Sequence, residues 1–135
     1  MADTMHLKVI APERIFYEGD VTMVEFRSSD GNRGVYPGHM AETCIIEPGE
    51  LMIHEGETVK IAALHAGFLE IRPEEVRVMA EIIEWPEEID VERAIKAKEK
   101  AQRQLARYRT DMNLIRAEMA LQRALVRIDT AEKGK

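Results

Sequence analysis

The sequence predicts a protein in two parts, an N-terminal antiparallel β-sandwich followed by a C-terminal α-helical hairpin. Three observations carry this prediction. Short apolar runs recur between His6 and Ile83 at intervals of about ten residues, with Gly and Pro between them, as in sandwiches and barrels. Trp85-Pro86 then interrupts the strand pattern. From Val91 onward the apolar residues recur at gaps of three and four, which is the spacing of a helix face.

The strands are expected within residues 1–86. Leu7 and Val9 are separated by a polar residue, and so are Val76 and Val78. Alternation of this kind predicts strands with one buried face and one face in solvent.

The helices are expected within residues 87–135. The second helix has an apolar seam at Leu114, Ala117, Leu121, Ala124 and Ile128. The first has a matching seam at Val91, Ala94, Lys98, Ala101, Leu105 and Tyr108. Alanines and a lysine bury little apolar area, and burial contributes only about 25 cal/mol per Å², so we expect the contact to be marginal.

The turn between the helices, Arg109-Thr110-Asp111, contains neither Gly nor Pro. Nothing in it prevents the two helices from straightening into one longer helix. A weak seam and a weak helix breaker together predict a mobile unit with two arrangements. At its start, Asp90 is a natural N-cap, because its carboxylate can accept backbone N–H groups of the first turn.

Charge is divided unevenly along the chain, whose net charge is −6. The span from Arg93 to Arg127 contains 10 basic residues and only three acidic ones, Glu99, Asp111 and Glu118. A solvated helix face is one explanation, but so one-sided an excess favours docking on an acidic partner. A nucleic-acid partner is disfavoured, because residues 1–86 are acidic and Tyr108 is the one aromatic residue in the basic span.

The sequence predicts no catalytic site. The four histidines, His6, His39, His54 and His65, do not form a metal-binding or catalytic spacing. There is no GxSxG elbow and no glycine-rich phosphate loop. No signal peptide or membrane span is recognisable, so we expect a protein in the cytosol or facing it.

Three motifs in order carry a family resemblance. They are Gly34-Val35-Tyr36-Pro37-Gly38-His39, Gly67-Phe68-Leu69-Glu70-Ile71-Arg72-Pro73 and Ile89-Asp90-Val91-Glu92-Arg93-Ala94. With the helix pair behind them, they make the chain resemble the epsilon subunits of the rotary F-type ATP synthases, from Leu7 to Ala131. The resemblance implies a sandwich of about ten strands in residues 1–86 and a mobile regulatory helix-turn-helix in residues 87–135.

The resemblance also implies a function. The chain would be a non-catalytic central-stalk subunit that couples rotation to catalysis and inhibits ATP hydrolysis through its helices. Its sandwich would bind the gamma subunit and the c-ring, and its raised helices would meet acidic segments of the catalytic alpha and beta subunits. It would lie on the cytoplasmic face of the membrane, attached only through these partners. The implied partner-binding residues are Gly34, Pro37, Gly38, His39, Arg103, Arg107 and Arg116.

No cofactor is required, but some bacterial members bind ATP as a regulatory ligand on the folded hairpin. Their motif is matched by Ile89, Asp90, Arg93 and Ala94. The resemblance adds Glu84, Arg123 and Arg127 to this site. The simpler alternative is that Asp90 only caps the helix and that the arginines face a protein partner.

Two segments depart from the family pattern, Met40-Ala41-Glu42-Thr43 and His65-Ala66. Both are expected near partner contacts, so they put those contacts in doubt but not the fold. Two other functions stay open: an ATP-sensing module that acts without a brake, and a basic-helix nucleic-acid binder.

Overall fold

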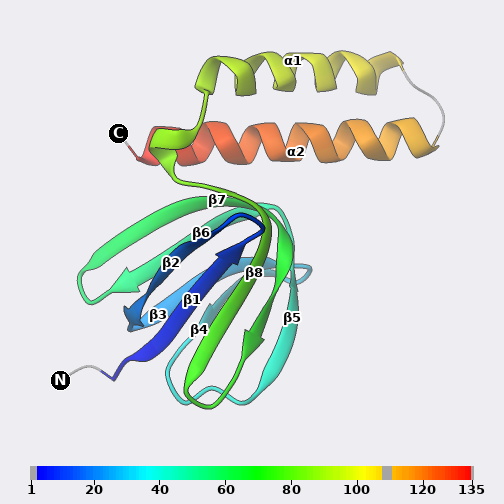
Figure 1. Cartoon of the computed structure of the whole chain (residues 1–135). Helices are drawn as coiled ribbons and strands as arrows, with labels where there is room; N and C mark the ends of the chain where they lie inside the picture. The colour runs from blue at the N-terminus through cyan, green and yellow to red at the C-terminus, as the bar shows by residue number, and fades with distance from the viewer. Residues whose placement is uncertain (1–2, 108–110, 135) are drawn as a thin grey trace.

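The computed structural model describes residues 3–107 and 111–134 (Figure 1). The predicted seam residue Tyr108 and the turn residues Arg109 and Thr110 lie outside these ranges. The strands are β1 (Met5–Ala11), β2 (Arg14–Val21), β3 (Met23–Ser28), β4 (Gly31–Val35), β5 (Glu42–Ile46), β6 (Gly49–Glu55), β7 (Thr58–Ile71) and β8 (Glu75–Glu84). They are followed by the short 3₁₀ helix η1 (Pro86–Glu88) and by the helices α1 (Val91–Arg107) and α2 (Asp111–Lys133).

The strands form one continuous sheet that folds into a sandwich. Their order is β2-β1-β8-β7-β6-β3-β4, and β5 pairs with β7 outside this path. Every pairing is antiparallel except that of β1 with β8, which is parallel. The predicted fold class, a sandwich followed by a helical hairpin, is therefore confirmed, with one parallel pair that the sequence did not indicate.

The described residues contain eight strands, so the expectation of about ten was too high. One reason is that the runs Val59–Leu64 and Phe68–Ile71 lie in the single long strand β7. The first half of β7 pairs with β6 and the second half with β5 along the same edge. The strand turns from one layer into the other through an irregularity at His65–Gly67, where the register with β8 shifts.

Gly67 makes this corner possible. Its φ is +152°, and an added Cβ would lie 2.2 Å from the carbonyl oxygen of Met79 on β8. Only a residue without a side chain allows the two backbones to approach so closely.

The sandwich has a large core of buried apolar side chains. Phe26, Leu7, Leu51, Ile53 and Leu69 are among its fully buried side chains. The cluster is built from residues of the eight strands, and Trp85 packs against its edge. The sandwich thus buries its apolar faces without help from the helices.

The junction after β8 is tied back to the sandwich. Trp85 stacks on Phe16 of β2 with ring centroids 4.2 Å apart. Arg14, two residues before Phe16, forms an ion pair with Glu88 at 2.9 Å. Ile89 follows in an extended conformation, and α1 begins two residues later.

The helices pack through the predicted seam. Ala94 and Ala101 are the buried residues of α1, and Ala117 and Ala124 are buried on α2. The larger seam residues between them are half-buried. The fully buried residues of the described seam are therefore alanines, which gives a close but small buried contact.

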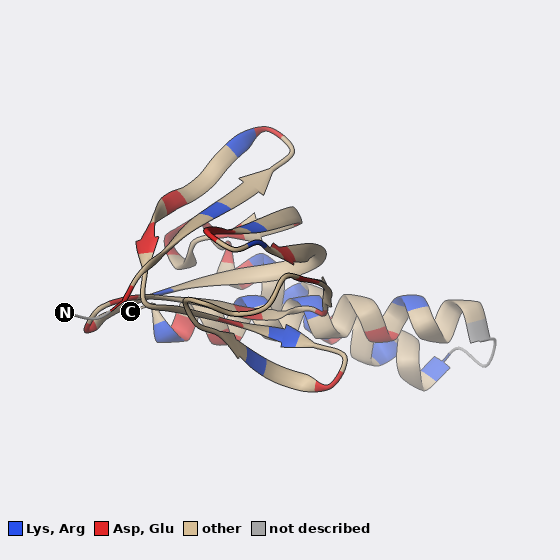
Figure 2. Ribbon diagram, turned by 90° about the horizontal axis from the view of Figure 1, so that it is seen from below, with Lys and Arg blue, Asp and Glu red and all other residues tan. Residues whose placement is uncertain are grey.

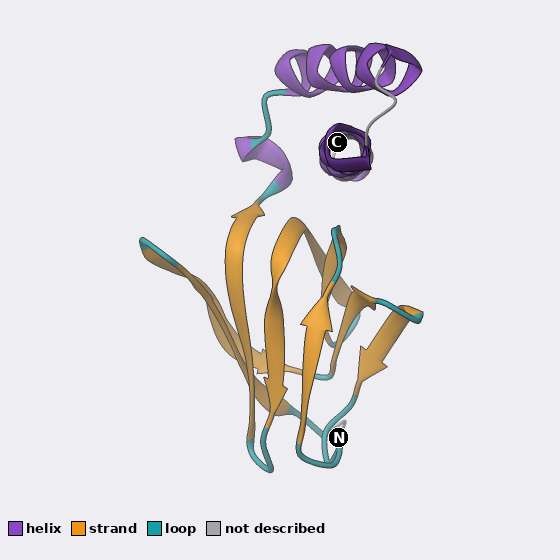
Figure 3. Cartoon of the chain, turned by 90° about the vertical axis from the view of Figure 1, so that its right-hand side faces the viewer, coloured by secondary structure: helices purple, strands orange, loops and turns teal. Residues whose placement is uncertain are grey.

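α2 lies between the sandwich and α1, as Figures 1 and 3 show. Its C-terminal half packs on β7, β6 and η1. The end of the hairpin formed by the last turns of α1 and the first turns of α2 extends beyond the sandwich (Figure 1). Neither helix of the described chain is long and apolar enough to cross a membrane.

We predict that a chain ending at Glu88 folds by itself, because the main core and the Phe16–Trp85 stack lie wholly before that point. Thermal unfolding followed by the fluorescence of Trp85, the only tryptophan, should show one cooperative transition. The full-length chain is the control. A fragment without near-ultraviolet circular dichroism would contradict the prediction.

Candidate functional site

A polar pocket lies where the sandwich, η1 and the two helices meet. Its volume is about 340 Å³. It is lined by Glu84, Glu88, Asp90, Arg93, Ala94, Ala97 and Arg127. Four parts of the fold contribute these side chains: the end of β8, η1, the start of α1 with the Asp90 cap, and the C-terminal half of α2.

Asp90 is fixed at the start of α1. Its Oδ1 accepts a hydrogen bond from the backbone N–H of Arg93 at 3.1 Å, and its carbonyl oxygen accepts the N–H of Ala94 at 3.0 Å. The predicted N-cap is therefore confirmed. The cap holds the first turn of α1 against the pocket and brings Arg93 to its edge.

Glu84 and Arg127 join the sandwich to α2. The Nε of Arg127 donates to Glu84 Oε1 at 2.7 Å, and both side chains are about one-quarter exposed. Glu88 is held by other partners: Arg14 and the backbone N–H of Trp85 both donate to its Oε1. The bond from Arg14 is the main reason that the pKa of Glu88 lies below its ordinary value, and Trp85 adds to it.

His65 lies beneath this ion pair. Its Nε2 is 3.3 Å from Glu84 Oε1, and its side chain is fully buried. Burial lowers its pKa from 6.5 to about 4, and the charge of Arg127 acts in the same direction, while the bond to Glu84 opposes them. His65 is therefore a neutral imidazole at pH 7.

The pocket combines anion-binding and amine-binding groups. The guanidinium groups of Arg93 and Arg127 can hold phosphate through charge-assisted hydrogen bonds. The carboxylates of Glu84, Glu88 and Asp90 can accept hydrogen bonds from an amino group. Within the described ranges, no group of three or more His, Cys, Asp or Glu side chains is arranged to hold a metal ion.

Five of the seven residues expected for an ATP site line the pocket: Glu84, Asp90, Arg93, Ala94 and Arg127. The other two do not. Ile89 is buried in a small cluster with Ala63 and Ala131. Arg123 is not part of the lining, although its charge acts on His65.

The sequence analysis did not assign Glu88 or Ala97 to this site. A signal for Ala97 exists in hindsight, because it lies one turn after Ala94 on the same face of α1.

The expected partner-binding residues lie at opposite ends of the molecule. Gly34 belongs to β4, and Pro37, Gly38 and His39 follow in the connection to β5. The pairing registers place this connection at the end of the sandwich away from the helices.

Arg103, Arg107 and Arg116 are exposed near the other extreme, on the part of the hairpin that extends past the sandwich. Figure 2 shows Lys and Arg residues along this part of the hairpin. The two sets of residues predicted to bind partners therefore lie on two separate surfaces.

The sequence analysis did not predict two apolar surfaces that the structure shows. Ile10, Met79, Phe68 and Ile45 are cross-strand neighbours on β1, β8, β7 and β5, and Phe68 and Ile45 are 41% and 75% exposed. The second consists of exposed Met112, Ile115 and Met119 near the start of α2. Apolar residues on the solvent side of an alternating strand were the available signal for the first surface.

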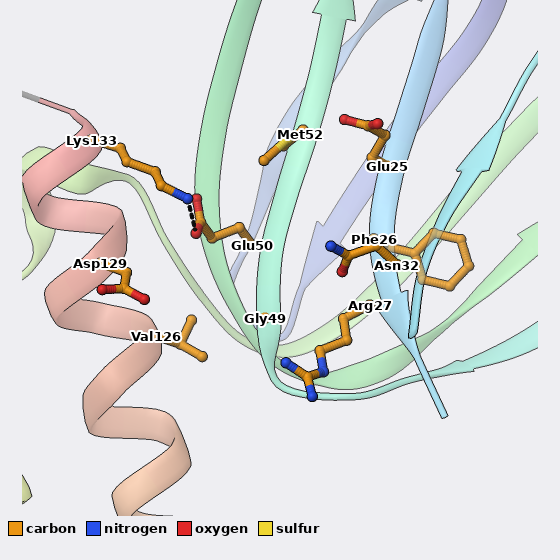
Figure 4. Close-up of a pocket in the computed structure, with 10 residues that line it drawn as sticks. All are labelled: Glu25, Phe26, Arg27, Asn32, Gly49, Glu50, Met52, Val126, Asp129 and Lys133. Atoms are coloured by element: carbon orange, nitrogen blue, oxygen red, sulfur yellow. Dashed lines mark hydrogen bonds and ion pairs between the residues drawn. The ribbon is translucent and has the colours of Figure 1, made fainter. Parts of the chain in front are cut away.

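A second pocket, of about 240 Å³, lies between α2 and strands β3, β4 and β6 (Figure 4). Lys133 of α2 donates to Glu50 of β6 at 2.7 Å across it. Val126 and Asp129 of α2 also line it. None of the residues predicted from the sequence is part of this lining.

Comparison with known proteins agrees with this architecture. Residues 4–86 match the family described as the ATP synthase delta/epsilon chain, beta-sandwich domain. Residues 87–132 match its long alpha-helix domain.

Among curated relatives, the ATP synthase epsilon chain of Halalkalibacterium halodurans is 39% identical over 129 residues, covering 95% of this chain and 97% of the relative. That of Caldanaerobacter subterraneus subsp. tengcongensis is 40% identical over 134 residues, covering 98% and 97%.

A chain in the cryo-EM structure of the Euglena gracilis mitochondrial ATP synthase, OSCP/F1/c-ring in rotational state 1, has the same fold. Its TM-score is 0.82 at 22% identity, and the match covers 96% of this chain and 81% of that one. These comparisons agree with the observed sandwich and helical hairpin, and they confirm the family resemblance predicted from the three motifs. The chain belongs to the ATP synthase delta/epsilon chain family.

Proposed function

We propose that this chain is a central-stalk subunit of an F-type ATP synthase whose helical hairpin restrains ATP hydrolysis when it leaves the sandwich. The observation that carries the proposal is the small apolar contact between α2 and a sandwich whose core is complete without it. In this proposal residues 1–86 bind the stalk and residues 87–135 are the mobile regulatory unit.

The apolar part of the docking contact is small. Its buried residues are Ala63, Ile89 and Ala131, and Val91 and Val126 pack against them. Two of the three buried side chains are single methyl groups. At about 25 cal/mol per Å², so small an area supports a contact that can open.

The polar part of the contact is incompletely satisfied. Glu50 Oε2, His65 Nδ1 and Thr130 Oγ1 are buried and have no hydrogen-bond partner among the described residues. All three belong to the interface of α2 with β6 and β7. A buried polar group without a partner costs about 1–3 kcal/mol, so the docked state is held below its attainable stability.

A pivot is available between the sandwich and α1. The Arg14–Glu88 ion pair and the Phe16–Trp85 stack fix η1 to β2. Movement would therefore begin after Glu88, at the extended Ile89.

The extended end of the hairpin has the chemistry for an acidic protein partner. Arg103, Arg107 and Arg116 supply positive charge. Met112 and Met119 continue along α2 the face that docks on the sandwich, but they lie where no strand covers them. Acidic segments of the catalytic alpha and beta subunits would meet this end in the raised state.

The sandwich would make the stalk contacts. The connection containing Pro37, Gly38 and His39 lies far from the helices, so it can reach the c-ring while the hairpin moves. The exposed row of Ile45, Phe68 and their neighbours is apolar enough to bind the gamma subunit. The subunit would then be attached to the membrane through its partners, on the cytoplasmic face, and would have no catalytic residue of its own.

ATP is the proposed ligand of the polar pocket. Arg93 comes from α1, Arg127 from α2 and Glu84 from the sandwich, so the pocket exists only while the hairpin is docked. A ligand that binds only this form stabilises it by RT ln(1 + [L]/Kd), about 2.7 kcal/mol at a hundredfold excess. An ATP-sensing module without a brake remains the alternative, and hydrolysis assays of the assembled enzyme separate the two.

Replacing Thr130 by Val should strengthen docking, because the change removes an unpartnered hydroxyl and keeps the shape of the side chain. Amide hydrogen exchange in the C-terminal half of α2 should slow by about fivefold or more, which corresponds to about 1 kcal/mol. Thr58→Val, at an exposed position of β7, is the matched control. Faster exchange in Thr130→Val would contradict weak docking by an unsatisfied interface.

Removing basic charge from the end of the hairpin should release ATP hydrolysis. We expect Arg103→Ala, Arg107→Ala and Arg116→Ala together to raise the ATPase rate of an assembled complex that this subunit inhibits. Three changes are needed because single exposed ion pairs contribute about 0–1 kcal/mol. The control replaces the exposed, non-basic Gln102, Asn113 and Glu118 by Ala in the same helices. An unchanged rate in the arginine variant would refute the brake.

Isothermal titration of the isolated chain with ATP tests the pocket. Arg127→Ala should weaken binding by tenfold or more, since a charge-assisted contact is worth about 1.5–3 kcal/mol. Arg123→Ala should have a smaller effect, because Arg123 does not line the pocket. Arg72→Ala, on the sandwich, should have none. If millimolar ATP gives no heat with the unaltered chain, the motif at Asp90 serves only as a helix cap.

A further inference from the structure

A single carboxylate oxygen connects the sandwich, the hairpin and a buried histidine. Glu84 Oε1, at the end of β8, lies 3.3 Å from His65 Nε2 and 2.7 Å from Arg127 Nε. His65 comes from the corner of β7, and Arg127 comes from α2. His65 lies within the irregular pairing at this corner, where the register of β7 with β8 shifts.

The imidazole is enclosed by the docked helix. Its side chain is 0% exposed, and α2 packs directly on β7. Nδ1 has no hydrogen-bond partner among the described residues. The ring is therefore enclosed, and within the described ranges its hydrogen-bond partner is Glu84 alone.

The charges around His65 oppose its protonation. Arg123 and Arg127 face it from α2, and Glu84 faces it from β8. Glu84 is already engaged by Arg127. A proton on His65 would place a further positive charge near Arg123 and Arg127, while Glu84 is already paired with Arg127.

The charged groups farther from His65 are engaged by other residues. Across the pocket, Glu88 is bound by Arg14 and Asp90 caps α1, while Arg93 adds another positive charge. On the side of β6, Glu50 is bound by Lys133 of α2. None of these carboxylates is hydrogen-bonded or ion-paired to the imidazole, so none of them compensates for its charge.

We propose that His65 is a proton-operated release for the hairpin, so that protonation of its imidazole separates α2 from the sandwich. Once α2 lifts, Arg123 and Arg127 leave with it. His65 and Glu84 are then free to form a solvated ion pair on the sandwich. Protonation of the imidazole is therefore disfavoured in the docked form and favoured in the raised form.

The sign of the effect follows from linkage. Docking lowers the pKa of His65, while in the raised form a solvated imidazole beside Glu84 has a pKa at or above its ordinary value. The docked form therefore has its full stability above about pH 6.5. Its stability relative to the raised form falls as the pH decreases toward the lowered pKa of His65. With one proton taken up, the docked-to-raised ratio falls by about tenfold per pH unit in this window. This inference rests on the proposed movement of the hairpin.

The test measures docking in the full chain as a function of pH. A Cys44→Ser background removes the only cysteine, and dyes on Glu57→Cys and Glu118→Cys, both exposed, report the distance between sandwich and α2 by energy transfer. Between pH 8 and pH 5 the unaltered His65 chain should open as the pH falls. His65→Gln, which keeps a hydrogen-bond donor toward Glu84 but cannot take up the proton, should remove this dependence. His65→Met replaces it if the Gln variant does not fold.

His54→Gln is the matched control. His54 is half-buried and is paired with a glutamate, Glu25, at 3.0 Å. It lies opposite Val59, at the other end of β6 from Glu50, the residue that Lys133 of α2 binds. Its replacement should leave the pH dependence intact. An identical pH profile in His65→Gln and the parent chain would overturn the inference.

A further variant separates failure of this inference from failure of the proposed movement. Val126→Glu places a charge in the apolar docking contact and should open the hairpin at every pH. If Val126→Glu opens it while the parent stays docked down to pH 5, the hairpin moves but His65 does not release it. If Val126→Glu also stays docked, the hairpin is fixed and both proposals are wrong.

Discussion

The contact of Arg127 with Glu84 is the interaction on which the arrangement of the two halves depends. It joins α2 to the end of β8 at 2.7 Å, closes one side of the polar pocket and covers His65. An ion pair that is still one-quarter exposed contributes modestly to stability, because solvent screens it. The closed pocket and the burial of His65 therefore both depend on a contact that costs little free energy to break.

The two halves differ sharply in how they are stabilised. The sandwich has large buried side chains such as Phe26 and Leu51, and even its junction is tied down by the stack of Trp85 on Phe16. The hairpin is held by alanines and by an interface that leaves the Thr130 hydroxyl unpartnered. Local opening follows the least stable contact in a structure, so motion would be confined to the helices while the sandwich stays rigid.

The sequence predicted what depends on local pattern and missed what depends on tertiary geometry. The alanine seam and the Asp90 cap follow from spacing within one helix, and the structure has both. The fusion of two apolar runs into β7 depends on the close approach of Gly67 to Met79, which no local signal gives.

The polar pocket shows the same division. Arg123 and Arg127 are one turn apart, and their spacing alone cannot decide which enters the pocket, since that depends on how α2 is rotated over β7. His65 was noted as a departure from the family pattern, but its burial becomes evident only when α2 is in place.

The nucleotide and the proton would act on the same equilibrium in opposite directions. ATP would bind the docked form through Arg93 and Arg127, whereas His65 would take up its proton in the raised form. Coupling between two ligands is reciprocal, so bound ATP would lower the proton affinity of His65 by the same factor by which protonation weakens ATP binding. A brake built in this way would engage when ATP is scarce and the surroundings are acidic. Neither ligand would need to touch the other, because Glu84 and Arg127 are common to both sites.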